Sequence, residues 1–139
     1  PSNNFGPRQN EEKFLPTIIR SIRDGKKIPI YGEGQQVREW TYVKHTADAV
    51  LFLCEQMLSG NCLGEIFNFS TSIELKNVDL VHKVCKILGV DFDECVEFVK
   101  DRPGHDFRYS INCDKLLRLG CCVNVDLDKE LEETVKEFK

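Results

Sequence analysis

Residues 27–40 read Lys-Ile-Pro-Ile-Tyr-Gly-Glu-Gly-Gln-Gln-Val-Arg-Glu-Trp, and this stretch sets the first part of the fold. Ile28–Tyr31 is a short run with strand-forming residues, and Pro29 within it favours the edge of a sheet. Gly32-Glu33-Gly34 reads as a turn. Residues 39–43 then alternate as a second strand. The stretch therefore predicts two short strands joined by a glycine turn.

A helix is predicted before this stretch. Apolar residues recur with a helical period between residues 14 and 22, and the pattern stops at Gly25. Asn10 is the expected N-cap, because two glutamates follow it in the favourable first turn. Pro16 leaves a second start open, at Phe14 or Leu15, with the proline in the first turn.

Helices and strands continue to alternate after the stretch. Further helices are predicted from a cap at Thr46 to Gly60, over residues 77–88 up to Gly89, from Asn112 or Asp114 to Gly120, and from Asp126 or Asp128 to Phe138. Further strands are predicted at residues 65–70 and 95–99. About five helices and three to four short strands indicate an α/β fold of α+β character in one domain, residues 1–139.

Composition excludes several classes of protein. The net charge is -4, with 41% hydrophobic and 30% charged residues. An acidic chain lacks the basic face expected of a nucleic-acid binder. No run of about 20 apolar residues is present, so no membrane span is expected. The seven cysteines form no C-x-x-C pair. They read as reduced thiols of a cytoplasmic protein, without a metal site. The chain starts at Pro1 without a signal sequence, and we expect it to be cut from a longer one.

Two arginines carry the functional hypothesis. Arg38 lies in the quoted stretch, and Arg102 lies in Asp101–Tyr109, which reads Asp-Arg-Pro-Gly-His-Asp-Phe-Arg-Tyr. A guanidinium grips phosphate and an aromatic ring covers a base, so the two segments together would clamp a nucleoside diphosphate. The alternative is that each arginine makes only a salt bridge, with Glu39 or Asp101 as its partner.

Covalent chemistry has no evident residues in this chain. Gly32-x-Gly34 is the only Gly-x-Gly, and no helix follows it closely, so it fails as a dinucleotide fingerprint. No Tyr-x-x-x-Lys pair occurs. Of the three histidines, His45 and His82 read as structural, and only His105 is a candidate for the site. The chain thus reads as a binding portion whose reactive half lies elsewhere, with no catalytic residue of its own.

Several segments, taken in order, resemble a known family. They are Ser-Asn-Asn-Phe-Gly-Pro at 2–7, Glu-Lys-Phe-Leu-Pro at 12–16, residues 29–43, Gly-Glu-x-Phe-Asn at 64–68, and Asp-Arg-Pro-Gly-His-Asp-x-Arg-Tyr at 101–109. Together they resemble the C-terminal portion of nucleotide-sugar 4,6-dehydratases of the dTDP-glucose type, in the extended short-chain dehydrogenase/reductase superfamily. One departure is Thr71-Ser72, where the family usually has two glycines.

The resemblance implies an enzyme in which NAD oxidises the sugar at C4, water is lost across C5 and C6, and hydride returns to C6. It implies that the Rossmann domain that binds NAD, and the catalytic residues, are absent here. It further implies a nucleotide-diphosphate sugar as ligand and a homodimeric full-length enzyme. The implied substrate-binding residues are Asn3, Lys13, Phe14, Pro29 and Tyr31 beside the base, Arg38 and Arg102 on the diphosphate, Asn77 and His105.

Other functions stay open at this point. They are a UDP-N-acetylhexosamine dehydratase, an epimerase or decarboxylase of the same superfamily, and a stand-alone nucleotide-sugar binding module without catalysis. A portion separated from its cofactor half should also expose an apolar patch. We expect that patch near the first helix and around Phe5.

Overall fold

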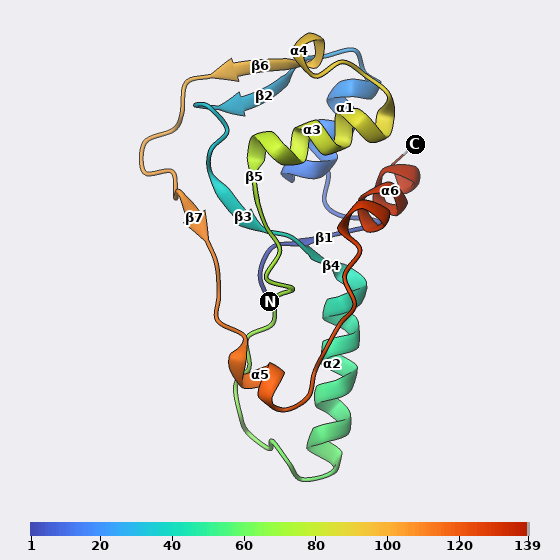
Figure 1. The fold of residues 1–139 in the computed structure, drawn as a ribbon, viewed down its shortest axis with the longest axis vertical. Coiled ribbons are helices and arrows are strands. Elements are labelled where there is room, and N and C mark those ends of the chain that lie inside the picture. Colours follow the sequence, from blue (N-terminus) through green and yellow to red (C-terminus); the bar gives the residue numbers. More distant parts are fainter. Residues whose placement is uncertain (139) are drawn as a thin grey trace.

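Strands and helices alternate through most of the computed structural model, which describes residues 1–138 (Figure 1). The elements are β1 (Asn4–Phe5), α1 (Phe14–Arg23), β2 (Ile28–Tyr31), β3 (Val37–Glu39), β4 (Thr41–Tyr42), α2 (Val43–Leu58), β5 (Glu74–Lys76), α3 (Asn77–Leu88), α4 (Phe92–Cys95), β6 (Val96–Val99), β7 (Arg108–Tyr109), α5 (Asp114–Arg118) and α6 (Leu127–Glu137). The mixed α/β class predicted from the sequence is confirmed. None of these helices is long and apolar enough to cross a membrane.

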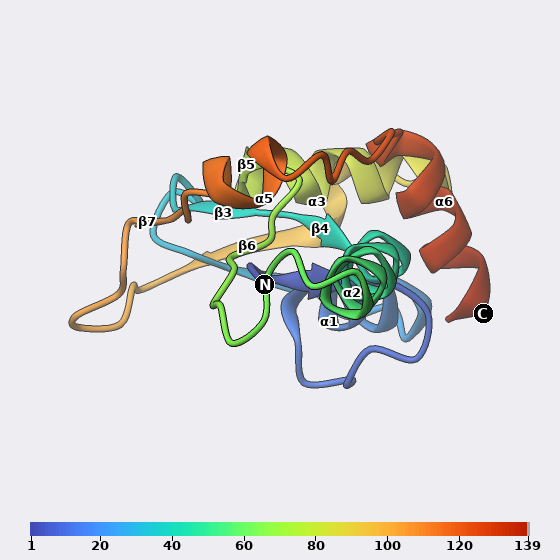
Figure 2. The same cartoon turned by 90° about the horizontal axis from the view of Figure 1, so that it is seen from below.

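The strands form three small sheets. β1 pairs with β4 and β2 with β6, both in parallel, while β3 lies between antiparallel β5 and parallel β7. Figure 2 shows β3, β4 and β6 between two layers of helices, with α3 and α5 on one side and α1 and α2 on the other, while α6 runs from the first layer to the level of the second. Because β6 and β7 pair with β2 and β3, the loop between them returns to the first strands of the chain.

The main hydrophobic core joins α1, β2, α3 and α6. Ile18 of α1, Ile28 of β2 and Leu80 of α3 are fully buried, and Leu131 of α6 closes the same cluster. Burying one such side chain contributes about 1.5–3 kcal/mol relative to leaving it in water. This core fixes the ends of β2 and α3 that carry candidate site residues.

A smaller cluster packs beside α2. Ala49 is the one buried residue of this 16-residue helix, and it packs with Phe69, Leu116 and Cys121. Phe52 and Leu53 of α2 pack partly against the same cluster, while Val43, Val50, Leu51, Met57 and Leu58 are exposed. Leu58 is 91% exposed. The helix therefore presents an apolar surface that the described residues leave uncovered.

The prediction of an exposed apolar patch around Phe5 and the first helix is wrong. Phe5 is 1% exposed and lies in the main core with α1. Seven of the twelve exposed large apolar side chains lie instead on α2 and on the segment that follows it: Val43, Val50, Leu51, Met57, Leu58, Leu63 and Ile66. We call these residues the α2 surface.

The strand predicted at residues 65–70 is not formed as a ladder with any other described strand. Its alternation is nevertheless present, because Phe67 and Phe69 pack on the smaller cluster while Ile66 is 86% exposed. A single extended segment becomes a β-strand only beside another edge. The strand prediction is therefore wrong for this chain, although the alternating burial of Phe67 and Phe69 that suggested it is present.

Two helix starts differ from prediction. α1 begins at Phe14 rather than after Asn10, as the alternative allowed, and its N-cap residue is Lys13. The Asn10 side chain instead accepts a hydrogen bond from the amide of Glu12. α2 begins at Val43, directly after β4, and Thr46 lies inside the helix and donates to Asn4.

The predicted strand at 39–43 is shorter and divided into β3 and β4. Further along, Ser72 has φ 58, in the left-handed region that glycine adopts without cost. This conformation accounts for the glycines usual at that place in the resembled family.

Candidate functional site

A cavity of about 780 Å³ opens where β2, β3 and the start of α3 meet the loop between β6 and β7. All nine residues predicted for the site line it: Asn3, Lys13, Phe14, Pro29, Tyr31, Arg38, Asn77, Arg102 and His105. These residues come from segments more than 90 positions apart in the chain. Their convergence is a property of the tertiary structure. The volume of the cavity lies within the range of small-molecule sites.

Arg38 is held firmly in the floor of this cavity. It lies in the middle strand β3 and is 8% exposed. Its guanidinium donates to the carbonyl oxygens of Val37, Asp106 and Phe107, and Nη2 lies 3.2 Å from Nε2 of His105. The Tyr109 ring lies 4.2 Å from the guanidinium carbon. Arg38 therefore ties β3 to the second arginine-bearing segment.

Neither predicted clamp arginine forms an ion pair within residues 1–138, so the salt-bridge alternative is wrong there. Glu39 accepts from Ser110 and Ile111. Asp101 accepts from Arg102 only through the backbone amide, not from the guanidinium. The remaining arginine of these segments, Arg108, differs because it pairs with Glu74 on β5. Its role is to join β7 to β5.

The cavity lining carries an excess of positive charge. The lining has three cationic residues, Lys13, Arg38 and Arg102, and one acidic residue, Glu12. A buried guanidinium whose hydrogen bonds go to neutral acceptors keeps its full charge in a medium of lowered dielectric constant. The arrangement is suited to an anionic ligand.

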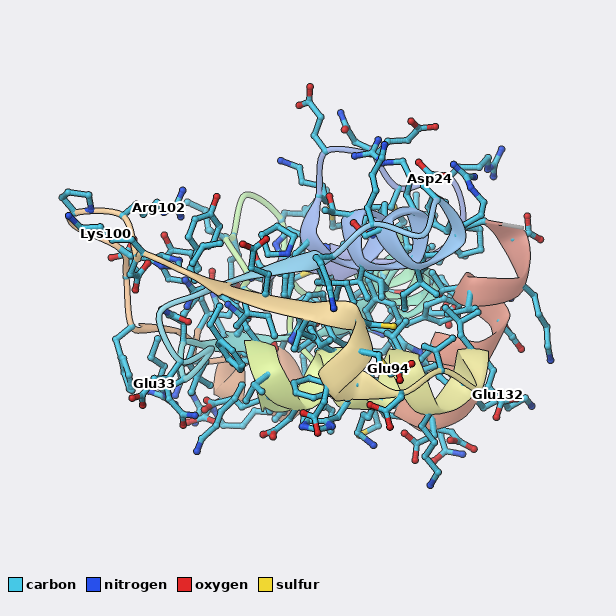
Figure 3. All side chains as sticks on the ribbon, turned by 90° about the horizontal axis from the view of Figure 1, so that it is seen from above. Asp24, Glu33, Glu94, Lys100, Arg102 and Glu132 are labelled. Atoms are coloured by element: carbon cyan, nitrogen blue, oxygen red, sulfur yellow. The ribbon has the colours of Figure 1, made fainter. Side chains whose placement is uncertain are left out.

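The two arginines differ in what they leave free. Both terminal nitrogens of Arg38 already have protein partners. Arg38 therefore offers a ligand a fixed positive charge rather than a bidentate pair of hydrogen bonds. Arg102 is exposed in the loop that projects from the body, and its guanidinium has no hydrogen-bond partner among the described residues (Figure 3). Its five donors are available for a phosphate.

β2 positions the aromatic side of the cavity. Ile28 and Ile30 point into the core, so Pro29 and Tyr31 face the other way and line the cavity. Tyr31 is 44% exposed, and its ring meets that of His105 edge-on, with centroids 6.0 Å apart. The exposed face of Tyr31 is thus free to cover a planar group.

The remaining predicted residues lie at the starts of elements. Asn3 precedes β1, and its carbonyl oxygen accepts from Thr41 of β4. Lys13 and Phe14 stand at the start of α1, and Asn77 is the first residue of α3. The backbone of each is fixed by a core element, while the side chain borders the cavity.

His105 connects the two segments. Its Nδ1 lies 2.6 Å from Oδ1 of Asp101, whose other oxygen accepts from Nε2 of Gln36 at 2.6 Å. The hydrogen bond from His105 lowers the pKa of Asp101, and the Arg102 amide and Gln36 act in the same direction against the effect of burial. Asp101 is therefore a carboxylate at neutral pH.

Two aromatic residues of the cavity lining, Tyr109 and Trp40, were not among the predicted site residues. Tyr109 packs against Arg38, and its hydroxyl donates to Asp106, which raises its pKa despite the opposing charges of Arg38 and Arg102. Trp40 is 5% exposed, and its indole N–H has no partner among the described residues. Its spacing of two from Arg38 on an extended chain was the available signal.

The other histidines have structural contacts, as predicted. Nε2 of His45 lies 2.6 Å from Glu130, which joins α2 to α6, and His82 stacks on Phe92 at 3.6 Å. Within residues 1–138, no group of His, Cys, Asp and Glu is arranged to hold a metal ion.

The glycine turn does not form a dinucleotide-binding site. Gly32 and Gly34 lie between β2 and β3, so a strand follows the turn where a phosphate-binding helix would be required. A Cβ on Gly34 would come within 2.9 Å of Val78. Gly34 is therefore needed for packing against α3, and the glycine turn does not fit the pyrophosphate of NAD.

Comparison with known proteins identifies relatives over nearly the whole chain. Residues 1–69 match the NAD dependent epimerase/dehydratase family. The chain is 40% identical over 118 residues to the low-salt glycan biosynthesis protein Agl12 of Haloferax volcanii, covering 85% of this chain and 36% of the relative. It is 35% identical over 148 residues to dTDP-glucose 4,6-dehydratase of Haemophilus influenzae, covering 99% and 43%.

Solved structures agree with these relatives. The fold matches DesIV, a dTDP-glucose 4,6-dehydratase from Streptomyces venezuelae with NAD bound, with a TM-score of 0.88, 35% identity, and coverage of 99% of this chain and 41% of that one. It also matches a UDP-N-acetylglucosamine 4-epimerase from Methanobrevibacter ruminantium, with a TM-score of 0.81, 28% identity, and coverage of 99% and 44%.

These similarities place the chain in the NAD dependent epimerase/dehydratase family. The chain spans about two fifths of the length of the curated relatives it matches.

Proposed function

We propose that this chain is the nucleotide-sugar binding portion of an NAD-dependent nucleotide-sugar 4,6-dehydratase acting on dTDP- or UDP-glucose. The observation that carries the proposal is the convergence of all nine chosen residues on one cavity whose lining holds three cations and one anion. Dehydratases among the similar proteins, and the Arg-Pro-Gly-His-Asp stretch, favour this reaction over epimerisation.

In this proposal the diphosphate lies against Arg38 and Arg102. Arg38 supplies a fixed positive charge from the floor, and Arg102 supplies hydrogen bonds from the loop. Pro29 and Tyr31 flank the base, since both line the outer side of β2. Asn3, Lys13, Phe14, Asn77 and His105 complete the pocket around the diphosphate and the sugar.

We assign no chemical step to the residues of this chain. NAD would supply hydride transfer, and its seat belongs to a portion of the protein outside residues 1–139, because the glycine turn here packs against α3 instead. The proton-transfer groups belong to the same missing portion. On this basis the 139-residue chain alone forms no 4-keto-6-deoxy product when given NAD and dTDP-glucose.

The exposed apolar residues of the α2 surface suggest that another part of the protein packs against it. Exposed apolar side chains lie along α2. Segment 65–70 has the alternating burial of a strand but belongs to no ladder, and its Phe69 carbonyl accepts a single backbone hydrogen bond, from Ser2. We propose that the cofactor-binding domain covers this surface and pairs with the segment. The complete enzyme is expected to be a cytoplasmic homodimer, which light scattering and cell fractionation would test.

The binding proposal is tested by calorimetric titration of dTDP, UDP and their glucose conjugates. Arg102→Ala is the cleaner variant, because Arg102 is exposed and makes no side-chain hydrogen bond in the described chain. Its loss should weaken dTDP by more than tenfold, since a charge-assisted hydrogen bond is worth about 1.5–3 kcal/mol. Arg38→Lys, which keeps the charge but not the planar contacts, should weaken dTDP and also loosen the loop.

A matched control is Arg118→Ala. Arg118 is an exposed arginine on α5 that does not line the cavity, so its removal changes the net charge equally without touching the site. Equal affinity of Arg102→Ala and Arg118→Ala for dTDP would contradict the proposal. Product formation by the isolated chain would contradict the absence of catalytic groups.

A further inference from the structure

Asp101 is the junction between the two arginine-bearing segments, although it does not line the cavity. Its Oδ1 accepts from the backbone amide of Arg102 at 2.8 Å and faces Nδ1 of His105 at 2.6 Å. Its Oδ2 accepts from Gln36, a buried side chain in the turn before β3. One carboxylate thus holds the loop, the imidazole and the turn together.

The neighbours of His105 determine where its proton lies. Arg38 can only donate hydrogen bonds, so Nε2 of His105, 3.2 Å from Nη2 of Arg38, must be the acceptor. The Asp101 carboxylate can only accept, so Nδ1 of His105 must be the donor. Both requirements are met by one form of the ring, the neutral imidazole with its proton on Nδ1.

This form of the ring matters for Arg38. The side chain of His105 is only 8% exposed, and the imidazole stands between Asp101 and the guanidinium. A ring with its proton on Nε2 would set two donors against each other at the Arg38 contact. The guanidinium would then have to turn away from the position in which it lines the cavity.

We propose that Asp101 is a positioning residue: it holds His105 in the Nδ1-protonated neutral form, whose Nε2 lone pair orients Arg38 toward the diphosphate of the ligand. The proposal rests on the proposed function for the identity of that ligand. The arrangement of protons within Asp101, His105 and Arg38 is a property of the protein alone and is measurable without any ligand.

The test is nitrogen-15 NMR of the imidazole rings at neutral pH, together with dTDP titration. The chain has three histidines, so the ring signals are assignable by replacing His45 and His82 in turn. In the unchanged protein, Nδ1 of His105 should show the protonated shift and Nε2 the unprotonated shift. Asp101→Ala should mix the two tautomers and weaken dTDP about tenfold, because a charge-assisted hydrogen bond is lost.

Asp101→Asn is the conservative rescue. Its oxygen can still accept from His105 and from the Arg102 amide. Its amide can donate to Oε1 of Gln36 once the Gln36 amide turns over, because Nε2 is the Gln36 atom that faces Asp101 and Oε1 has no partner among the described residues. This variant should keep the tautomer and stay within about threefold of the original affinity. Glu33→Ala is the matched control, because this exposed carboxylate lies at the same end of the molecule and its side chain contacts none of the three residues (Figure 3).

The outcomes separate the two proposals. A His105 ring protonated on Nε2, or an unchanged tautomer in Asp101→Ala, would overturn the positioning role of Asp101. So would a loss of affinity in Glu33→Ala as large as that in Asp101→Ala. Failure of the unchanged protein to bind any of the nucleotides would instead contradict the proposed function, while the tautomer measurement would still decide the role of Asp101.

Discussion

α3 and α2 are both helices with apolar residues at helical spacing, but their surroundings differ. α3 buries Leu80, Val81, Val84 and Cys85 against α1 and α6, whereas the longer α2 buries only Ala49. Figure 1 shows α3 inside the upper body and α2 extending below it. The comparison shows that an apolar stripe specifies a helix and a face to be covered, but not what covers it.

The largest expected contrast between the two helices is in thiol reactivity. Burial raises the pKa of Cys85 on α3 to about 11, while Cys54 on α2 is exposed. At pH 8 only about one thousandth of Cys85 is thiolate, the reactive form, and the side chain is also inaccessible. Iodoacetamide should modify Cys54 at least about a thousandfold faster than Cys85, as followed by mass spectrometry of peptides.

Labelling in concentrated guanidinium chloride is the control, because both thiols should then react alike. Similar rates for Cys54 and Cys85 in the folded protein would mean that the core around α3 opens readily, and the contrast between the helices would fail.

Truncation of leucines should show the same contrast in stability. Leu80 is fully buried and Leu58 is 91% exposed. Leu80→Ala should lower the free energy of unfolding by about 2–5 kcal/mol through lost burial and the cavity left behind. Leu58→Ala should change it by no more than about 0.5 kcal/mol. Urea unfolding followed by circular dichroism measures both, and a comparable loss in Leu58→Ala would show that the α2 surface is already covered in the isolated chain.

The smallest expected effect concerns the α2 surface itself. Leu51→Lys should reduce the binding of a hydrophobic dye and the self-association of the 139-residue chain by a few-fold, because it interrupts a contiguous apolar area. Glu55→Lys is the control on the same helix, since it adds positive charge without removing apolar surface. If both variants reduce dye binding equally, charge rather than apolar area is responsible.

Much of the local structure follows from the sequence. The helical period predicted α3 at residues 77–88, and Gly89 ends it with φ 70, as expected of a C-terminal glycine. Of the two starts predicted for the last helix, Asp126 is confirmed, because its side chain accepts from the amide of Lys129. Weaker signals gave wrong starts, as at Thr46, because a strand that runs directly into α2 leaves no residue free to act as a separate cap.

Nine residues of the cavity lining were predicted from the sequence, but the contacts among them were not. Arg38 and Arg102 stood out through their glycine- and aromatic-containing segments. Nothing local indicated that Arg38 would donate to the carbonyl oxygens of Asp106 and Phe107, or that Asp101 would hold His105. The Arg38 contacts join residues 68 and 69 positions apart, and sequence periodicity reports only on neighbours within a few residues. Asp101 and His105 are four positions apart, but they lie in a loop, where no periodic pattern predicts their contact.

The sequence by itself determined which segments are helical or extended and which side chains are able to bind an anion, because these depend on local spacing and on the chemistry of each residue. Tertiary structure decided that β7 lies beside β3, that three cations share one cavity, and that segment 65–70 has no strand beside it within residues 1–138. The physical reason is that strand pairing and charge convergence are set by long-range packing, where the closing of the main core selects one arrangement among many that the local preferences allow.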